Sequence, residues 1–113
     1  MASTGPATAH FGKTEKRLFD KMLELYDNNE HKKAFNNAET ILDKHPEHPE
    51  TMAFKALILN KLKKKTEAYD LIKKALFKNM ANFTCWHVYG ILNRAHKKFD
   101  DARKAYLNAL KAD

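Results

Sequence analysis

The sequence predicts an all-α fold in which one helix-turn-helix unit occurs three times. Three observations support this prediction. The chain of 113 residues contains only three glycines and three prolines, and it is rich in the helix-favouring residues lysine, alanine, leucine and glutamate. Apolar residues recur at intervals of three and four positions, as on one face of a helix. The order of small and large residues also repeats every 34 positions without a gap.

The 34-residue period is clearest at positions where two antiparallel helices would touch. Such helices pack closely only where small side chains lie at the contact and a larger side chain fills the space beside it. The second helix of each unit has one set of aligned small residues, Ala34, Ala68 and Ala102, and a second aligned position that is Ile41, Ala75 and Ala109. The first helix has the aligned sets Leu18, Met52 and Trp86, and Met22, Ala56 and Gly90. This order resembles the tetratricopeptide repeat, and the resemblance implies a solenoid of six helices in a right-handed superhelical stack.

The helices can be placed in order along the chain. Residues 1–12 are small and polar, and we expect them to be disordered or added for expression. Helices are then expected at residues 13–26 and 31–44, because Asp27, Asn28 and Asn29 favour a turn. After Pro46, which stops the second helix, Pro49 begins the third.

Three repeats follow from this order, at about residues 15–48, 49–82 and 83–113. Asn82 or Thr84 is expected to cap the helix that opens the third repeat. A repeat array needs a polar outer face on its last helix. None follows Leu110, so we expect the chain to be the front of a longer solenoid. Weak self-association is expected through Tyr106, Ala109 and Leu110.

Composition excludes some classes of protein and favours others. Cys85 is the only cysteine, so no disulfide framework exists, which is typical of a reducing compartment. No apolar run approaches the roughly 18 residues of a membrane helix, and residues 1–12 lack the apolar core of a signal peptide. We therefore expect a soluble, cytoplasmic protein without membrane contact.

The net charge of +7 is unevenly distributed and indicates an anionic partner. The first 48 residues carry seven basic and eight acidic residues, whereas residues 49–82 carry eight lysines and three acidic residues. The predicted contact is a lysine ridge that consists of Lys61, Lys63, Lys64, Lys65, Lys97 and Lys98. Lys63 and Lys64 align with Lys97 and Lys98, so adjacent repeats carry paired lysines at the same edge. The alternative is an ordinary solvated turn between two helices.

The first helices of such repeats line a concave groove. We expect a mixed apolar surface there, suited to a peptide or a helix, and call it the concave surface. It consists of Phe19, Leu23, Tyr26, Leu57, Asn60, His87, Ile91 and Arg94. The alternative is that much of this surface packs against other parts of a longer chain.

The residue types needed for catalysis are not combined in any recognisable way. His45 and His48 flank Pro46 without a further cluster of ligands, so a metal site is not expected. Cys85 and His87 are two residues apart on one helix and point in different directions. The three scattered glycines cannot form a phosphate or acetyl-CoA loop. We therefore expect no cofactor and no enzyme activity.

A more specific resemblance covers about residues 51–111. It is carried by Cys85-Trp86-His87-Val88-Tyr89-Gly90-Ile91-Leu92, by Lys97-Lys98-Phe99-Asp100-Asp101-Ala102 and by Ala56-Leu57-Ile58-Leu59-Asn60. These runs resemble the amino-terminal part of the auxiliary subunit of the N-terminal acetyltransferase A complex. The resemblance implies a non-catalytic scaffold that binds a separate acetyltransferase subunit, mainly through repeats absent here. It also implies docking on the ribosome, or contact with a regulatory protein. The alternative function is an independent peptide-binding adaptor.

Overall fold

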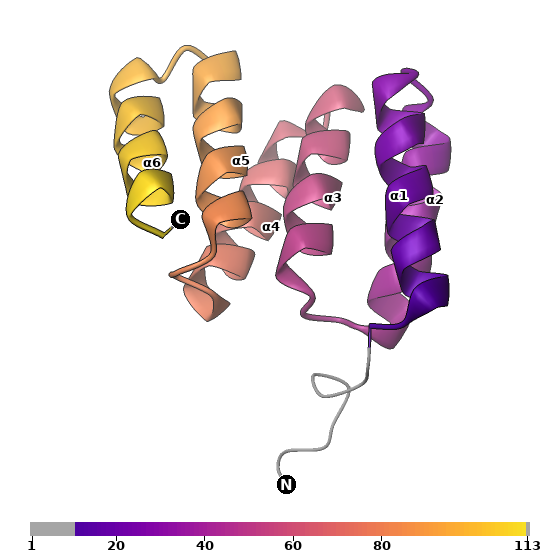
Figure 1. The fold of residues 1–113 in the computed structure, drawn as a ribbon. Coiled ribbons are helices and arrows are strands. Elements are labelled where there is room, and N and C mark those ends of the chain that lie inside the picture. The colour runs from indigo at the N-terminus through magenta and orange to yellow at the C-terminus, as the bar shows by residue number, and fades with distance from the viewer. Residues whose placement is uncertain (1–10, 113) are drawn as a thin grey trace, which may run out of the picture.

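The computed structural model describes residues 11–112, and these residues form six α-helices and no β-strand (Figure 1). Successive helices pair into three repeats. Their bounds are α1 Lys13–Asp27, α2 His31–Lys44, α3 Pro49–Lys61, α4 Lys65–Lys78, α5 Phe83–Ala95 and α6 Phe99–Ala112. The helices predicted at residues 13–26 and 31–44 are confirmed, the first with one more residue. No helix within residues 11–112 is long and apolar enough to cross a membrane.

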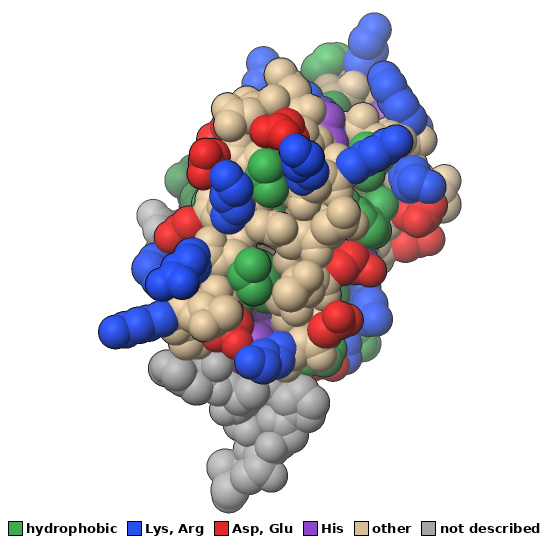
Figure 2. Space-filling model, turned by 90° about the vertical axis from the view of Figure 1, so that its right-hand side faces the viewer, with side chains coloured by type: hydrophobic (Ala, Val, Ile, Leu, Met, Phe, Trp, Pro, Cys, Tyr) green, Lys and Arg blue, Asp and Glu red, His purple; other side chains and the backbone are tan. Residues whose placement is uncertain are grey.

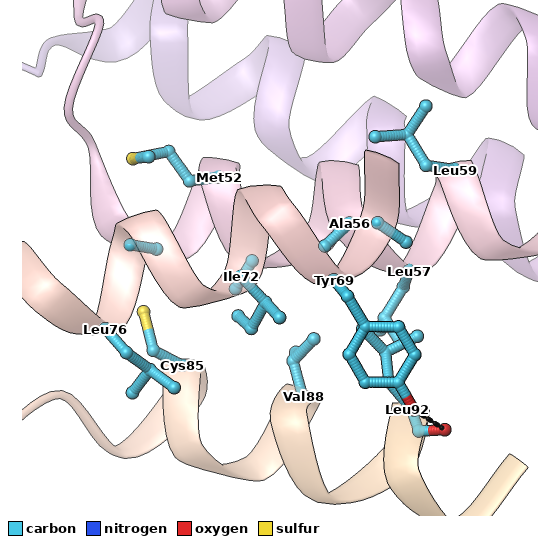
Figure 3. Close-up of a cluster of buried hydrophobic side chains, with 13 residues drawn as sticks. Met52, Ala56, Leu57, Leu59, Tyr69, Ile72, Leu76, Cys85, Val88 and Leu92 are labelled. Carbon is cyan, nitrogen blue, oxygen red and sulfur yellow. Dashed lines mark hydrogen bonds between the residues drawn. The ribbon is translucent and has the colours of Figure 1, made fainter. Parts of the chain in front are cut away.

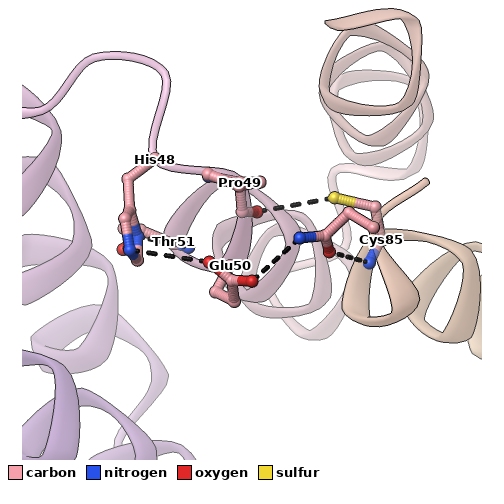
Figure 4. Close-up of polar contacts among 6 residues, drawn as sticks. His48, Pro49, Glu50, Thr51 and Cys85 are labelled. Carbon is pink, nitrogen blue, oxygen red and sulfur yellow. Dashed lines mark hydrogen bonds and ion pairs between the residues drawn. The ribbon is translucent and has the colours of Figure 1, made fainter. Parts of the chain in front are cut away.

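Side chains just before α3 and α5 determine where these helices begin (Figure 4). Pro49 is the first residue of α3, where its missing N–H leaves no helical hydrogen bond unmade. The Nδ1 atom of His48 accepts a hydrogen bond from the backbone N–H of Thr51 at 3.3 Å. In α5, Oδ1 of Asn82 accepts from the backbone N–H of Cys85 at 2.9 Å. Asn82 is therefore the residue that caps α5, and the other candidate, Thr84, is not.

The prediction for the amino-terminal tail is wrong at its end. Residues 1–10 lie outside the described residues, but Phe11 and Gly12 are placed. The ring of Phe11 stacks on that of His48, with centroids 4.1 Å apart and planes 3° apart. Phe11 also meets the edges of Phe19 and His45. An aromatic side chain next to this partly apolar surface gains from packing on it, so the chain is ordered before α1 begins.

The turn inside each repeat has the same backbone conformation. Its second-last residue before the next helix has φ in the left-handed region, with values of 64°, 66° and 64° for Asn29, Lys63 and Lys97. The following N–H donates to a carbonyl five residues earlier: Glu30 to Leu25, Lys64 to Leu59 and Lys98 to Asn93. This helix ending is the Schellman motif, in which glycine and then asparagine are the favoured left-handed residues. All three turns lie at one end of the molecule (Figure 1).

Two buried clusters form the core. The larger one lies among α3, α4 and α5 and includes Met52, Leu57, Ile72, Val88 and Leu92 (Figure 3). The smaller one joins the first repeat to α3 through Met22, Leu25, Ala34, Ala38 and Ile58. α3 packs on α2, α4 and α5, so apolar residues are buried around most of its circumference.

The aligned alanines lie where the helices are closest. Ala34 and Ala68 are fully buried and Ala102 is 3% exposed. Ala109 is also buried, and Trp86 is half-buried against the larger cluster. The indole Nε1 of Trp86 donates to the backbone carbonyl of Met80 at 2.7 Å, which satisfies its only donor.

Gly90 is required by the aromatic ring opposite. A Cβ atom added at Gly90 would lie 2.5 Å from Cε1 of Tyr106. The equivalent pairs are Ala56 with Ile72 in the second repeat and Met22 with Ala38 in the first. The larger residue of the pair is on the first helix in the first repeat and on the second helix in the other two repeats. In every repeat the other residue is small enough for close packing.

This contact predicts an interaction between two substitutions. We expect Gly90→Ala to destabilise the fold by about 1–2 kcal/mol, because overpacking outweighs a gain in helix propensity of about 1 kcal/mol. In the Tyr106→Ile background, which copies the pair of the second repeat, the same change should be neutral or stabilising. Denaturant unfolding of the two single variants, the double variant and the parent measures the coupling. Purely additive effects would contradict the predicted contact.

Candidate functional site

The six lysines of the predicted ridge are all exposed. They lie at the two turns that follow α3 and α5, and these turns share one end of the molecule (Figure 1). They are Lys61, Lys63, Lys64, Lys65, Lys97 and Lys98. The tertiary structure therefore gathers two separate sequence runs into one region.

A polar contact joins the end of α3 to the α5–α6 turn. Nε2 of His96, in the α5–α6 turn, lies 2.7 Å from Oδ1 of Asn60 in the last turn of α3. Partial burial of His96, together with the charges of Lys65 and Lys98, lowers its pKa below the usual value. Lysines from both turns are thus near enough to act on one imidazole.

By contrast, the face formed by α1 and α2 has both signs of charge. Lysine, arginine and acidic side chains are interspersed over it (Figure 2). Several of them pair along the helix, such as Lys21 with Glu24 at 3.6 Å and Lys33 with Glu30 at 3.1 Å. Exposed pairs of this kind contribute little to stability, but they leave less unpaired charge for a partner.

The predicted concave surface is only partly accessible. Leu57 is 6% exposed and belongs to the larger buried cluster, so its placement on this surface is wrong. The physical reason is that α3 has neighbours on several sides, whereas the prediction assumed one buried stripe. Asn60 is engaged with His96, and Ile91 packs partly against the core.

The remaining residues of the concave surface fall into two groups. Phe19, Leu23 and Tyr26 pack partly against the smaller cluster, and Phe19 meets the edge of Phe54 with centroids 5.8 Å apart. His87 and Arg94 are exposed, and the ring of His87 stacks on Phe83. The accessible part of this surface therefore lies mainly on α5.

The surface predicted for self-association also needs correction. Ala109 is 2% exposed, and Tyr106 is half-buried over Gly90, because both face α5. Leu110 is 68% exposed and Leu107 is 52% exposed. Only the leucines are available to a neighbouring molecule.

A cleft that the sequence did not reveal lies among α2, α3 and α4. Its volume is about 310 Å³, and its lining combines apolar and charged side chains. The lining residues are Phe35, Lys55, Leu59, Glu67, Asp70, Leu71 and Lys74. Because three helices contribute to it, no single stretch of sequence marks it.

A buried carboxylate at the start of α1 was also missed. Oε1 of Glu15 accepts a hydrogen bond from the backbone N–H of Gly12 at 2.9 Å, and Oε2 lies 3.3 Å from Nζ of Lys44 and 3.6 Å from Nε2 of His45. The backbone N–H of Glu15 itself lowers the Glu15 pKa to about 2, against the effect of burial, with help from the backbone N–H of Gly12 and from the hydrogen bond and charge of the Lys44 side chain. The one sequence signal is a glutamate three residues after the helix cap.

His45 and His48, the pair considered for a metal, have other contacts. His45 is buried beside Glu15. Nδ1 of His48 lies 2.8 Å from Oγ1 of Thr51, and its Nε2 lies 3.5 Å from Oε1 of Glu50. Burial and the nearby His45 lower the pKa of His48, against the opposing effect of Glu50. These histidines therefore connect α2, α3 and the chain before α1.

Glu15 predicts a pH dependence of stability. Its pKa falls from 4.5 to about 2 on folding, so the ionised form stabilises the fold above about pH 4.5. This contribution is lost as the pH falls through that range toward 2. We expect Glu15→Gln to be less stable than the parent at neutral pH, with the difference closing as acid is added. Thermal unfolding of both proteins between neutral pH and pH 2 tests this prediction. A difference in stability that stays constant with pH would show that the ionised form of Glu15 is not responsible.

Cys85 is fully buried, and burial raises the pKa of its thiol to about 12. Its Sγ also donates to the carbonyl of Pro49 at 3.6 Å (Figure 4). We expect the folded protein to react with a thiol reagent on the order of a hundredfold more slowly than the unfolded chain, because so little thiolate is present. Rapid reaction of the folded protein at mildly alkaline pH would contradict this assignment.

Comparison with known proteins identifies the family to which the chain belongs. The model of the family described as "Psidin, N-terminal TPR repeats region" matches residues 15–113. The chain is 45% identical over 101 residues to the mouse protein named N-alpha-acetyltransferase 16, NatA auxiliary subunit. It is 38% identical over 99 residues to the N-terminal acetyltransferase A complex auxiliary subunit NAA15 of Arabidopsis thaliana. Each alignment covers 88% of this chain, but only 12% and 11% of those proteins.

Solved structures agree. A chain of the structure described as Naa15/Naa10 bound to HypK-THB superposes with a TM-score of 0.86 at 46% identity, over 89% of this chain and 15% of that chain. The Sgt2 TPR domain from Aspergillus fumigatus gives 0.78 at 15% identity, over 98% of this chain and 72% of that chain, which shows the fold alone. The predicted all-α repeat fold and the predicted resemblance are both confirmed. The chain belongs to the Psidin family of amino-terminal tetratricopeptide-repeat regions and is similar to the corresponding part of NatA auxiliary subunits.

Proposed function

We propose that this chain forms amino-terminal repeats of a NatA auxiliary subunit and acts as part of a non-catalytic scaffold. The observation that carries this proposal is its 45% identity to a protein named as a NatA auxiliary subunit, over 88% of the chain. The similarity to a chain in a Naa15/Naa10 structure supports a scaffold that holds an acetyltransferase subunit. The expected location is the cytoplasm, where new protein chains emerge from ribosomes.

Cys85, the one cysteine of the chain, is packed in the larger buried cluster, which is compatible with a structural role. Cys85 is buried and its pKa is about 12, so its thiol is neutral and cannot act as a nucleophile at neutral pH. We propose that contact with the catalytic subunit is made mainly by other repeats of the longer protein, since this chain covers only 12% of its relative.

Docking to the ribosome is the finer part of the proposal. The lysine ridge supports it, because the six lysines are exposed and lie at one end of the molecule. Lysines that neutralise several phosphates release counterions, and this gives an affinity that falls steeply with salt. The first repeat has Asn29 and Glu30 at the equivalent positions, so the ridge is confined to the second and third repeats.

A ribosome-binding experiment tests this proposal. We expect the chain to sediment with purified ribosomes at low salt and to be released as salt is raised. Charge reversal of four ridge lysines should abolish binding, because each change replaces an attraction to phosphate by a repulsion. The changes are Lys63→Glu, Lys64→Glu, Lys97→Glu and Lys98→Glu.

The control reverses the same number of charges elsewhere. Lysines of the first repeat provide it, as Lys16→Glu, Lys21→Glu, Lys32→Glu and Lys33→Glu. Equal loss of binding in both variants would show that only net charge matters and would contradict a defined ridge. Binding that survives the ridge changes but fails with His87→Asp would favour the peptide-binding adaptor instead. Leu57→Asp does not serve this purpose, because Leu57 is buried and its change would unfold the chain.

A further inference from the structure

We propose that Lys63 and Lys97, at the tips of the α3–α4 and α5–α6 turns, are the two ridge lysines that contact the phosphodiester backbone of RNA. We infer that both are retained at these positions at a cost in folding stability. This inference rests on the proposed ribosome contact and specifies which residues make it.

The backbone provides the first argument. Lys63 and Lys97 have φ values of 66° and 64°, in the left-handed region. That conformation brings Cβ close to the following carbonyl oxygen, so it is unfavourable for a lysine and more tolerable for asparagine. Asn29 occupies the equivalent position in the first repeat, with φ of 64°. Lysine therefore replaces a better-suited residue in the two repeats that carry the ridge.

The contacts of the neighbouring lysines provide the second argument. Nζ of Lys64 lies 3.9 Å from Oε1 of Glu67, and Nζ of Lys98 lies 5.0 Å from the centre of the Tyr69 ring. Within residues 11–112, no ion pair shorter than 4.0 Å involves Lys63 or Lys97. Neither lysine therefore makes an ion pair in the described residues that would offset an unfavourable backbone conformation.

The geometry of the two turns provides the third argument. The 2.7 Å contact between Asn60 and His96 holds the end of α3 against the α5–α6 turn. The two Schellman turns make the same backbone hydrogen bond, so Lys63 and Lys97 occupy equivalent positions within their turns. The backbone positions of Lys63 and Lys97 are therefore held relative to each other, so less backbone ordering is needed when both lysines contact one partner.

The surroundings of this junction are predominantly positive. Besides burial, Lys65 and Lys98 both lower the pKa of His96. Among the acidic groups at these turns, Glu67 pairs with Lys64, Asp100 lies 3.7 Å from Arg103, and Asp101 acts on Tyr69. A nucleic-acid backbone offers successive phosphates that can meet two fixed cations. Lysine contacts a phosphate as a point charge and reads no base, so the predicted binding is independent of sequence.

The test is the double variant Lys63→Asn/Lys97→Asn, which copies the first repeat. We expect the midpoint of thermal unfolding to rise by about 5 °C, because asparagine adopts the left-handed conformation at a lower energetic cost than lysine. Binding to ribosomes and to an RNA duplex of unrelated sequence should weaken roughly tenfold. The salt dependence should lose about one unit of slope for each lysine that contacts a phosphate.

Two control variants separate charge from conformation. Lys63→Arg/Lys97→Arg keeps both charges and the backbone cost, so its binding and stability should match those of the parent. Lys61→Asn/Lys65→Asn removes two charges of the same ridge from helical positions, so stability should not rise and binding should fall less. Free inorganic phosphate at the same total phosphate concentration should compete poorly, since it cannot join the two lysines.

The outcomes distinguish this inference from the proposed function. If Lys63→Asn/Lys97→Asn binds RNA like the parent while the four-lysine reversal does not, the inference is wrong and the ribosome contact stands. If that variant is no more stable than the parent, the argument from the backbone is overturned. If the parent binds neither ribosomes nor RNA at low salt, the proposed ribosome contact fails, and with it the partner assigned here.

Discussion

The close contact between the two helices of each repeat is the constraint on which the rest of the structure depends. It requires a small residue at Ala34, Ala68 and Ala102, which are all buried. It also requires that each large side chain face a small one, as Tyr106 faces Gly90. If the helices moved apart at these points, the residues that now form the two buried clusters would lose part of their packing.

The second and third repeats are joined by polar contacts at both ends of α3. At one end, Nδ2 of Asn82 donates to Oε2 of Glu50 at 2.8 Å, and at the other Asn60 contacts His96. The apolar cluster that includes Ile72 and Val88 packs among α3, α4 and α5 (Figure 3). These two hydrogen-bonded contacts and the apolar cluster together oppose movement of the second repeat relative to the third. This explains how the lysines of two different turns acquire a defined relation.

The first repeat is attached in another way. Its connection to α3 uses Ile58 and the edge-to-face contact of Phe19 with Phe54. The chain before α1 strengthens this region, since Phe11 stacks on His48 and Glu15 contacts both Gly12 and His45. The charge distribution follows the same division, because the mixed-sign face belongs to the first repeat and the lysine ridge to the other two (Figure 2).

The sequence by itself determined the repeat, because helix pairing depends on local periodicity and on residue sizes that recur every 34 positions. It also predicted the helix start at Pro49 and narrowed the cap of α5 to Asn82 or Thr84, since caps and prolines act within one turn. Only the tertiary structure decided which residues of α3 are accessible, because burial of Leu57 depends on packing from neighbouring helices. It alone placed Glu15 beside His45, and it alone showed that Lys63 and Lys97 have left-handed backbones. Side-chain partners depend on residues far apart in the chain, and a one-dimensional pattern does not contain those distances. The left-handed turns are local, but lysine is not a residue type that marks such a conformation.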